Sequence, residues 1–265
     1  MVKNTILVIF GIGLVIVLIF QLNGADKTYP LLSKKNSISL KQWNIKFDGL
    51  IKSVVKKKSH PVYKTNLVDY KSLVKNKVFI ELGSLLNSIG SENASEKERL
   101  AAWLNIYNYL AMKKVVDNIG IKKLSDLNKG LSRVWTQDAG IVNGTTVSLD
   151  TVEHKIIRAR FKEPRVHFAL VCAALSCPDL RLEAFTGEKL EEQLKDQLTV
   201  FMKNSKKGLK IDRANKVIYL TKIMKWFSGD FGDVKKWLLK KGIITKEESN
   251  FKIKYLDYDW KLNSL

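Results

Sequence analysis

The chain opens with an uninterrupted run of apolar positions. Residues 5–20 carry no charge and follow Lys3. The run approaches the ~18 apolar residues of a membrane span and exceeds the roughly 7–15 apolar residues of a cleavable signal peptide. Residues 22–26 offer no small-x-small cleavage pattern. We therefore expect residues 1–24 to be a transmembrane anchor or signal segment, favour an uncleaved anchor over a cleaved signal or a buried core helix, and expect a linker over residues 25–38.

After this run the apolar positions recur with helical spacing. The pattern predicts a helix over Ser39–Lys57 and amphipathic helices over Glu188–Met202 and Val234–Lys241. Residues 95–98 have the sequence Ser-Glu-Lys-Glu, which is a capping-box pattern. The helix that they open continues to about Met112 and is apolar nearly all round, so we expect it to be buried.

Shorter apolar runs predict strands. Asn143-Gly144 lies between two β-branched runs and indicates a hairpin, and a second hairpin is expected around Ala214-Asn215. Residues 166–171 form a short apolar run that we interpret as a buried strand, and residues 251–255 form a last one. In a regular strand, alternation points His167 and Cys172 to opposite faces.

These elements predict an α+β fold. About 240 residues follow the anchor, and they contain few prolines, no long Gly/Ser tract and no internal repeat. We expect a single globular domain over residues 39–265. Its N-terminal helices pack on a small, mostly antiparallel sheet built from the two hairpins and the His167 strand, and an N-terminal transmembrane helix precedes it.

The net charge of the chain restricts which classes of partner we expect. Lys and Arg number 46 against 26 Asp and Glu, which gives a net charge of +20. The charge comes mostly from short lysine clusters without interleaved aromatic residues, so we do not expect nucleic acid as a partner. A domain outside the cytoplasm, held in the cell membrane by a single pass, would present this charge to anionic lipid and envelope polymers. A solvated surface without a dedicated partner is the alternative.

The candidate chemistry gathers in one stretch. Cys172 and Cys177 are the only cysteines, and His167 and His154 are two of the three histidines. Thiols and imidazoles are readily tuned near neutral pH, so their crowding indicates a site. A helix over about Thr151–Ala159 would place His154 in its first turn, where the helix dipole favours a neutral imidazole.

Two functions remain open from these residues. In a thiol hydrolase or acyl transferase acting on an envelope peptide or amide, Cys172 or Cys177 is the nucleophile and His154 or His167 the general base. The groups that could orient the imidazole are Asp150, Glu153, Asn105 and Asn108. In a binding or scaffolding module, the cysteines instead form a disulfide, which requires Cα atoms within about 7 Å.

Asn105 and Asn108 lie three residues apart, so they share one face of the buried helix. Each amide must find a partner or lose about 1–3 kcal/mol. They either tie the helix to a neighbouring loop or orient a site. A zinc site made by the two cysteines and His154 and His167 is a third, weaker alternative. Phosphate-loop, dinucleotide and nucleophile-elbow motifs are missing, so we expect no cofactor.

Several motifs together resemble the domain of unknown function 547 family, over roughly residues 40–265. The resemblance implies one domain and brings with it no settled activity, cofactor or set of catalytic residues. The segments that carry it are His60 with 67–70, 102–108, 148–150 leading to 153–158, 164–172 through Cys177-Pro178, and 258–263.

Overall fold

A computed structural model describes residues 38–59, 62–91 and 93–265 of the chain. The expected anchor over residues 1–24 and nearly all of the expected linker over residues 25–38 lie outside these residues, as does His60. Within the described ranges, no helix combines the length and the apolar character needed to cross a membrane.

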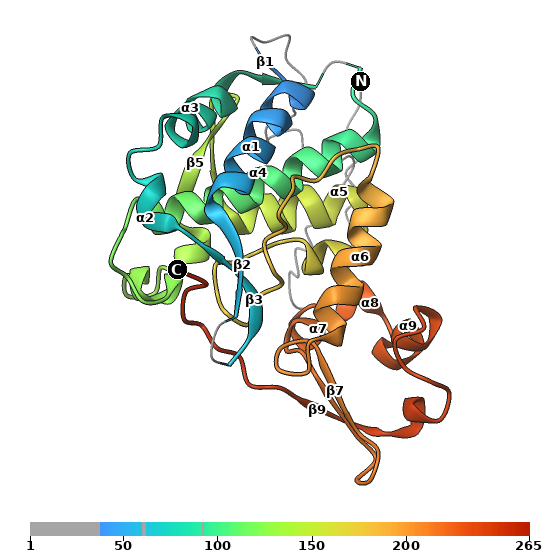
Figure 1. The fold of residues 1–265 in the computed structure, drawn as a ribbon. Coiled ribbons are helices and arrows are strands. Elements are labelled where there is room, and N and C mark those ends of the chain that lie inside the picture. The colour runs from blue at the N-terminus through green and yellow to red at the C-terminus, as the bar shows by residue number, and fades with distance from the viewer. Residues whose placement is uncertain (1–37, 60–61, 92) are drawn as a thin grey trace, which may run out of the picture.

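The N-terminal part is a layer of helices around α4 (Glu96–Val116), which crosses the middle of the view in Figure 1. The predicted capping box is confirmed, because Ser95 accepts from the Glu98 amide while the Glu98 side chain accepts from the Ser95 amide. α1 (Leu40–Val54) confirms the first predicted helix and has its own capping box. α2 (Tyr70–Leu73) and α3 (Lys77–Leu85) follow it.

The core of this layer is aromatic. Trp43 and Phe47 of α1 are fully buried and stack at 5.2 Å between ring centroids. Tyr109 of α4 meets the Trp43 ring edge-on at 5.9 Å. Fifteen residues of α4 are buried, which confirms the prediction of a buried helix.

The strands form several small sheets. β1 (Ile38–Ser39) pairs in parallel with β4 (Ile89–Gly90), and β2 (Val55–Ser59) pairs with β3 (Lys64–Val68). The two predicted hairpins are confirmed as β5 (Asp138–Val142) with β6 (Thr145–Ser148), and β7 (Leu209–Asp212) with β8 (Val217–Leu220). β9 (Lys252–Tyr255) joins β8 in parallel. A mixed α+β fold is therefore correct, but the prediction that both hairpins share one sheet is wrong.

The predicted strand over residues 166–171 is also wrong, because Pro164–Phe168 form a 3₁₀-helix. Pro164 is at the start of its first turn, and the Glu163 side chain accepts from the Arg165 amide. Bonds from the Ala169 and Leu170 amides to the Val166 carbonyl close the next turn. The backbone is thus satisfied locally and needs no neighbouring strand.

A smaller core lies in the C-terminal part, shown in orange and red in Figure 1. α6 (Leu190–Lys203) and α9 (Val234–Lys240) confirm the two other predicted helices, and α7 (Ile223–Trp226) and α8 (Ser228–Phe231) lie between β8 and α9. Phe168 is fully buried here and contacts Phe201, Phe231 and Trp237. The shorter elements are η1 (Leu86–Ser88), η2 (Leu124–Leu127), η3 (Val134–Thr136), η4 (Thr151–Arg158, a π-helix), α5 (Ala159–Phe161), η5 (Pro164–Phe168) and η6 (Glu248–Asn250).

The C-terminal strap, residues 258–265, returns from the smaller core to the helical layer (Figure 1). Its backbone bonds to three separate regions. Asn263 and Leu265 pair with Val68 of β3, the Leu262 amide donates to the Lys122 carbonyl, and the Asn263 amide donates to the Ala173 carbonyl. The strap therefore carries Tyr258 and Trp260 into fixed positions.

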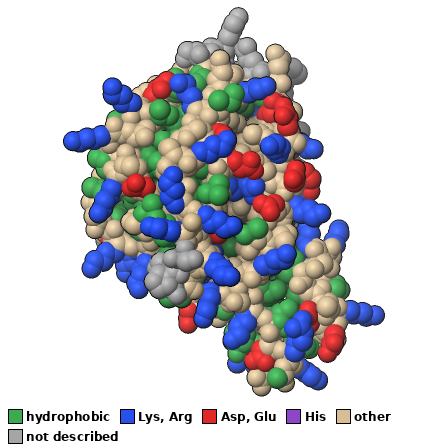
Figure 2. All heavy atoms as spheres, in the orientation of Figure 1, with side chains coloured by type: hydrophobic (Ala, Val, Ile, Leu, Met, Phe, Trp, Pro, Cys, Tyr) green, Lys and Arg blue, Asp and Glu red, His purple; other side chains and the backbone are tan. Residues whose placement is uncertain are grey.

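The surface shows how the excess charge is spread. In Figure 2, Lys and Arg side chains are scattered over the whole visible face, with fewer acidic side chains between them. No single basic patch dominates this face, as expected for a solvated lysine-rich surface.

Candidate functional site

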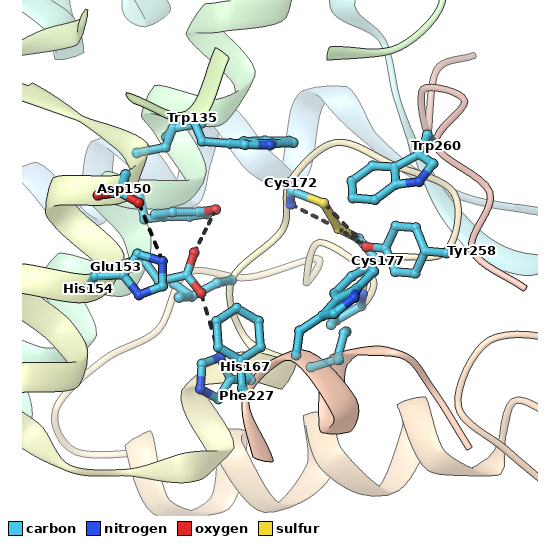
Figure 3. Close-up of a pocket in the computed structure, with 16 residues that line it drawn as sticks. Trp135, Asp150, Glu153, His154, His167, Cys172, Cys177, Phe227, Tyr258 and Trp260 are labelled. Carbon is cyan, nitrogen blue, oxygen red and sulfur yellow. Dashed lines mark hydrogen bonds and ion pairs between the residues drawn. A yellow bond between two sulfur atoms is a disulfide. The ribbon is translucent and has the colours of Figure 1, made fainter. Parts of the chain in front are cut away.

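A cavity of about 260 Å³ lies beside the predicted cysteine and histidine segment. Six of the candidate residues line it: Cys172, Cys177, His154, His167, Asp150 and Glu153 (Figure 3). The strand prediction had placed His167 and Cys172 on opposite faces. Because the segment is a 3₁₀-helix followed by a loop, both side chains instead reach the same cavity.

The two cysteines are joined in a disulfide, with their Cα atoms 6.2 Å apart. The Cys172 amide donates to Cys177 Sγ at 3.1 Å, and the Tyr258 hydroxyl lies 3.4 Å from Cys172 Sγ and 3.1 Å from Cys177 Sγ. Burial raises the pKa of Tyr258, so its phenol keeps its proton. The disulfide geometry is that expected for the binding module, and a disulfide-bonded sulfur is not a nucleophile.

Glu153 projects from the π-helix η4 between a phenol and an imidazole. The Tyr107 hydroxyl of α4 lies 3.4 Å from Glu153 Oε2, and His167 Nδ1 lies 3.6 Å from Oε1. Burial, together with the Glu153 charge, raises the pKa of Tyr107, so the phenol remains a donor. The side chain of Glu153 is 14% exposed, which leaves part of the carboxylate facing the cavity.

His167 is held from its other side by Asp230 of α8. Its Nε2 lies 2.7 Å from Asp230 Oδ2, and Arg158 donates to both oxygens of Asp230 at 2.5 and 2.7 Å. The bonds from Arg158, followed by that from His167, lower the pKa of Asp230 to about 2. Asp230 is therefore ionised and accepts from Nε2. Among the described residues, the buried Nδ1 has no hydrogen-bond partner.

His154 lies between Arg158 and Asp150. Its Nδ1 contacts Nη1 of Arg158, which has only donors, so Nδ1 is the acceptor in that contact. Nε2 points toward Asp150 Oδ1 at 3.5 Å.

Asn105 and Asn108 do not line the cavity. Asn105 exchanges hydrogen bonds with the backbone of Phe185 and also donates to Asn44. Asn108 donates to the Ala169 carbonyl at 3.0 Å and accepts from the Val171 amide at 2.9 Å. Each amide ties the helix to a loop, and Asn108 fixes the backbone that leads directly into Cys172.

Aromatic residues complete the wall, and the sequence interpretation missed most of them. Trp226 and Phe227 both line the cavity, whereas their neighbour Phe231 is buried in the smaller core. Phe227 stacks on His167 at 3.9 Å between ring centroids. Tyr258 and Trp260 arrive on the strap, and Trp135 on η3. The signals available were the aromatic cluster beside Asp230 and the Tyr-Asp-Trp motif of the resemblance.

Metal binding finds no support here. Among the described residues, no group of three or more His, Cys, Asp or Glu side chains could hold a metal ion. Two of the four residues proposed as zinc ligands, Cys172 and Cys177, are joined to each other in the disulfide.

The comparison with known families bears on this same segment. Residues 91–202 match the family described as "Protein of unknown function, DUF547". The match confirms the resemblance that the sequence motifs indicated, and the matched residues include all eight candidates. No curated protein and no solved structure matches the chain. The family description carries no activity, so a function must be argued from the cavity itself.

Asp230→Asn is expected to destabilise the protein at neutral pH by about 1–3 kcal/mol, because the buried His167 and the partly buried Arg158 lose a charged acceptor. The pKa of Asp230 is about 2 when folded, against an ordinary value of 3.8. Its contribution is therefore present above pH ~4 and is lost as the pH falls toward 2.

Denaturant unfolding between pH 7 and pH 2 tests this expectation. The stability difference between wild type and Asp230→Asn should shrink below pH 4, whereas the fully exposed Asp257→Asn should match wild type throughout. A difference that stays constant down to pH 2 would show that the Asp230 charge does not contribute.

Proposed function

We propose that the chain is a membrane-anchored domain, held outside the cytoplasm, that binds a small ligand in the disulfide-lined cavity. The observation that carries this proposal is the composition of the wall. It is largely aromatic, with a few placed polar groups, as in ligand-binding pockets generally. The volume of about 260 Å³ lies near the lower end of such pockets, so it suits a small molecule or the end group of a larger one.

Two features support the location. Residues 5–20 have the length and composition of an anchor, and a disulfide persists in oxidising compartments. The full chain should then resist alkaline carbonate extraction from membranes, and a chain starting at Asp26 should be released. If both chains are released from the membrane, the membrane anchor in this proposal is wrong.

Binding rather than catalysis is favoured by the state of the sulfurs. Both are consumed in the disulfide, and the polar side chain that contacts both of them is the Tyr258 phenol, not an imidazole. His167 and Arg158 are likewise both hydrogen-bonded to Asp230. A preformed wall of this kind can hold a ligand without any covalent step.

Fluorine NMR of the full chain in detergent, with its six tryptophans replaced by 5-fluorotryptophan, tests binding. The probes are tetramethylammonium, N-acetylglucosamine, D-alanyl-D-alanine and benzoate. We expect at least one probe to shift the resonances of Trp135, Trp226 and Trp260 saturably, while the buried Trp43 and Trp103 stay unchanged. If none of the four probes moves the cavity resonances, the binding function is wrong.

A second candidate is the thiol hydrolase or acyl transferase acting on an envelope peptide or amide. It is favoured by one observation: both sulfurs, both histidines and Glu153 line one cavity. Reduction by a dithiol would free Cys172, the less buried of the two cysteines. Its thiol would pass a proton to an imidazole and attack an acyl carbon, and the amine would leave with that proton.

Iodoacetamide labelling across pH separates the two functions. The binding module predicts no labelling before reduction, and after reduction a Cys172 with an apparent pKa near the ordinary ~8.5. An apparent pKa well below that value, lost in Cys172→Ser while the melting temperature is kept, would favour the enzyme instead.

A further inference from the structure

We infer that the ligand of this cavity is a small organic cation, an alkylammonium or quaternary ammonium group. The inference rests on the proposed binding function and names its ligand class. Two independent properties of the cavity carry it, the sign of the charge in its wall and the arrangement of its aromatic rings.

The wall is acidic in a chain that carries a net charge of +20. Among the described residues, no lysine or arginine lines the cavity, while Asp150 and Glu153 both do. Arg158 does not line it; its guanidinium bonds both oxygens of Asp230 and contacts His154 Nδ1. The free charge that faces a ligand is therefore carboxylate, which repels an anion and attracts a cation.

The rings pack against one another as one aromatic wall. Tyr258 is tilted by 57° to Trp226 and by 49° to Trp260, with centroids 4.9 and 4.4 Å apart, and Trp226 stacks on Trp260 at 5.6 Å and 26°. Trp135 continues the wall at 6.2 Å from Trp260. The face of an aromatic ring carries negative π-density that attracts an ammonium group, so a ring face that borders the cavity favours a cation.

The carboxylates lie across the cavity from two of the rings. In Figure 3, Asp150 and Glu153 lie on one side and Tyr258 and Trp260 on the other, with the disulfide between them. A cation in the middle can contact a carboxylate and a ring face together. The Tyr107 hydroxyl contacts the Glu153 carboxylate from behind and the His167 ring lies beside it, so little side-chain freedom is lost on binding.

The ammonium group has two conceivable sources, a free small molecule or the headgroup of a zwitterionic phospholipid in the membrane that anchors the chain. Both offer the same chemistry to the cavity. Trp226 and Trp260 are 47% and 38% exposed, so the cavity opens toward solvent and can accept the end of a larger molecule.

Fluorotryptophan NMR of the full chain in choline-free non-ionic detergent tests the ligand class. Choline and tetramethylammonium should shift the Trp226 and Trp260 resonances saturably. Dimethylbutanol, the neutral carbon isostere of choline, should bind at least about tenfold more weakly, as the loss of cation–π and carboxylate contacts implies. Equal binding of choline and its isostere would overturn the inference.

Variants assign the effect to the cavity. Glu153→Gln and Trp260→Leu should each weaken choline binding about tenfold, Trp260→Phe should restore most of it, and Glu247→Gln, an exposed residue that does not line the cavity, should leave it unchanged. Undisturbed Trp43 and Trp103 resonances check that each variant is folded. Unchanged choline binding in both Glu153→Gln and Trp260→Leu would also overturn the inference.

Two further experiments distinguish the two sources of the ammonium group, and distinguish the ligand class from the binding function. In phosphatidylglycerol nanodiscs, added phosphatidylcholine should shift the same resonances if the headgroup is the ligand, and only free choline should do so if it is a small molecule. Should N-acetylglucosamine or the dipeptide bind while every cation fails, the ligand class is wrong and the binding function stands.

Discussion

Lys207→Ala is expected to lower the free energy of unfolding by about 3–5 kcal/mol, among the largest single-residue effects in this chain. The side chain of Lys207 is 1% exposed, and its Nζ lies 2.5 Å from Asp179 Oδ1 and 3.0 Å from Thr65 Oγ1. Burial lowers the pKa of Lys207 and the Asp179 charge opposes that shift. Removing the ammonium leaves Asp179 mostly buried without its counter-charge.

The pair also positions the loop that leaves the disulfide. Asp179 follows Cys177 by two residues, and the next residue accepts from Asn66 of β3 through its carbonyl at 2.8 Å. Lys207 therefore links β3, the loop after Cys177 and the segment before β7. We expect its loss to loosen the cavity wall on the disulfide side as well as to destabilise the fold.

Guanidinium unfolding provides the measurement, and Lys206→Ala the matched control. Lys206 is exposed and adjacent in sequence, so its loss should change stability by no more than about 0.5 kcal/mol. Lys207→Met combined with Asp179→Leu should recover much of the loss, because an apolar pair needs no counter-charge. Equal midpoints for Lys207→Ala and Lys206→Ala would contradict the prediction.

Local signals in the sequence predicted local structure well. The Ser95 capping box and the Asn143-Gly144 turn each involve residues within a few positions, so their physics is contained in the sequence pattern. Residues 166–171 were harder, because a short apolar run fits a strand or a buried turn equally. Local backbone bonds to the Val166 carbonyl close the turn, and Asn108 of α4 adds to it by donating to the Ala169 carbonyl and accepting from the Val171 amide.

Only those residues of the candidate site that lie close together in the sequence could be predicted. Crowding of thiols and imidazoles indicated Cys172, Cys177, His154 and His167, and all four line one cavity. Asp230, Trp135 and Tyr258 come from distant segments, so no spacing rule connects them to the cysteines. The disulfide depends on a turn in which the Cys177 amide donates to the Ala174 carbonyl. The sequence did not predict this turn.

The cavity is assembled from two parts of the chain. The segment that matches the family, residues 91–202, contributes Glu153, both histidines and the disulfide. Trp226, Phe227, Tyr258 and Trp260 lie outside that match and supply the larger part of the aromatic wall. In the cation proposal, the polar end of the site thus belongs to the matched segment, and most of the aromatic wall depends on α7, Phe227 and the strap.

Deleting the strap, residues 258–265, is expected to have the second large effect. Six backbone hydrogen bonds join it to the rest of the described chain, at Val68 (two), Lys122, Ala173, Leu175 and Ser176. At about 0.5–1.5 kcal/mol for each bond, the loss is about 3–9 kcal/mol. The deletion also leaves the Tyr70 hydroxyl, which is buried, without its 2.7 Å partner Asn263 Oδ1.

The deletion should also open the cavity, because Tyr258 and Trp260 leave with the strap and the disulfide loses its phenol contact. Removing only Ser264 and Leu265 is the control: it deletes one of the six backbone bonds and should cost about 1 kcal/mol while Trp226 keeps its wild-type fluorine shift. Guanidinium midpoints and the Trp226 resonance are the measurements. If both truncations unfold at the same guanidinium concentration, the strap is not what fastens the cavity wall to the helical layer.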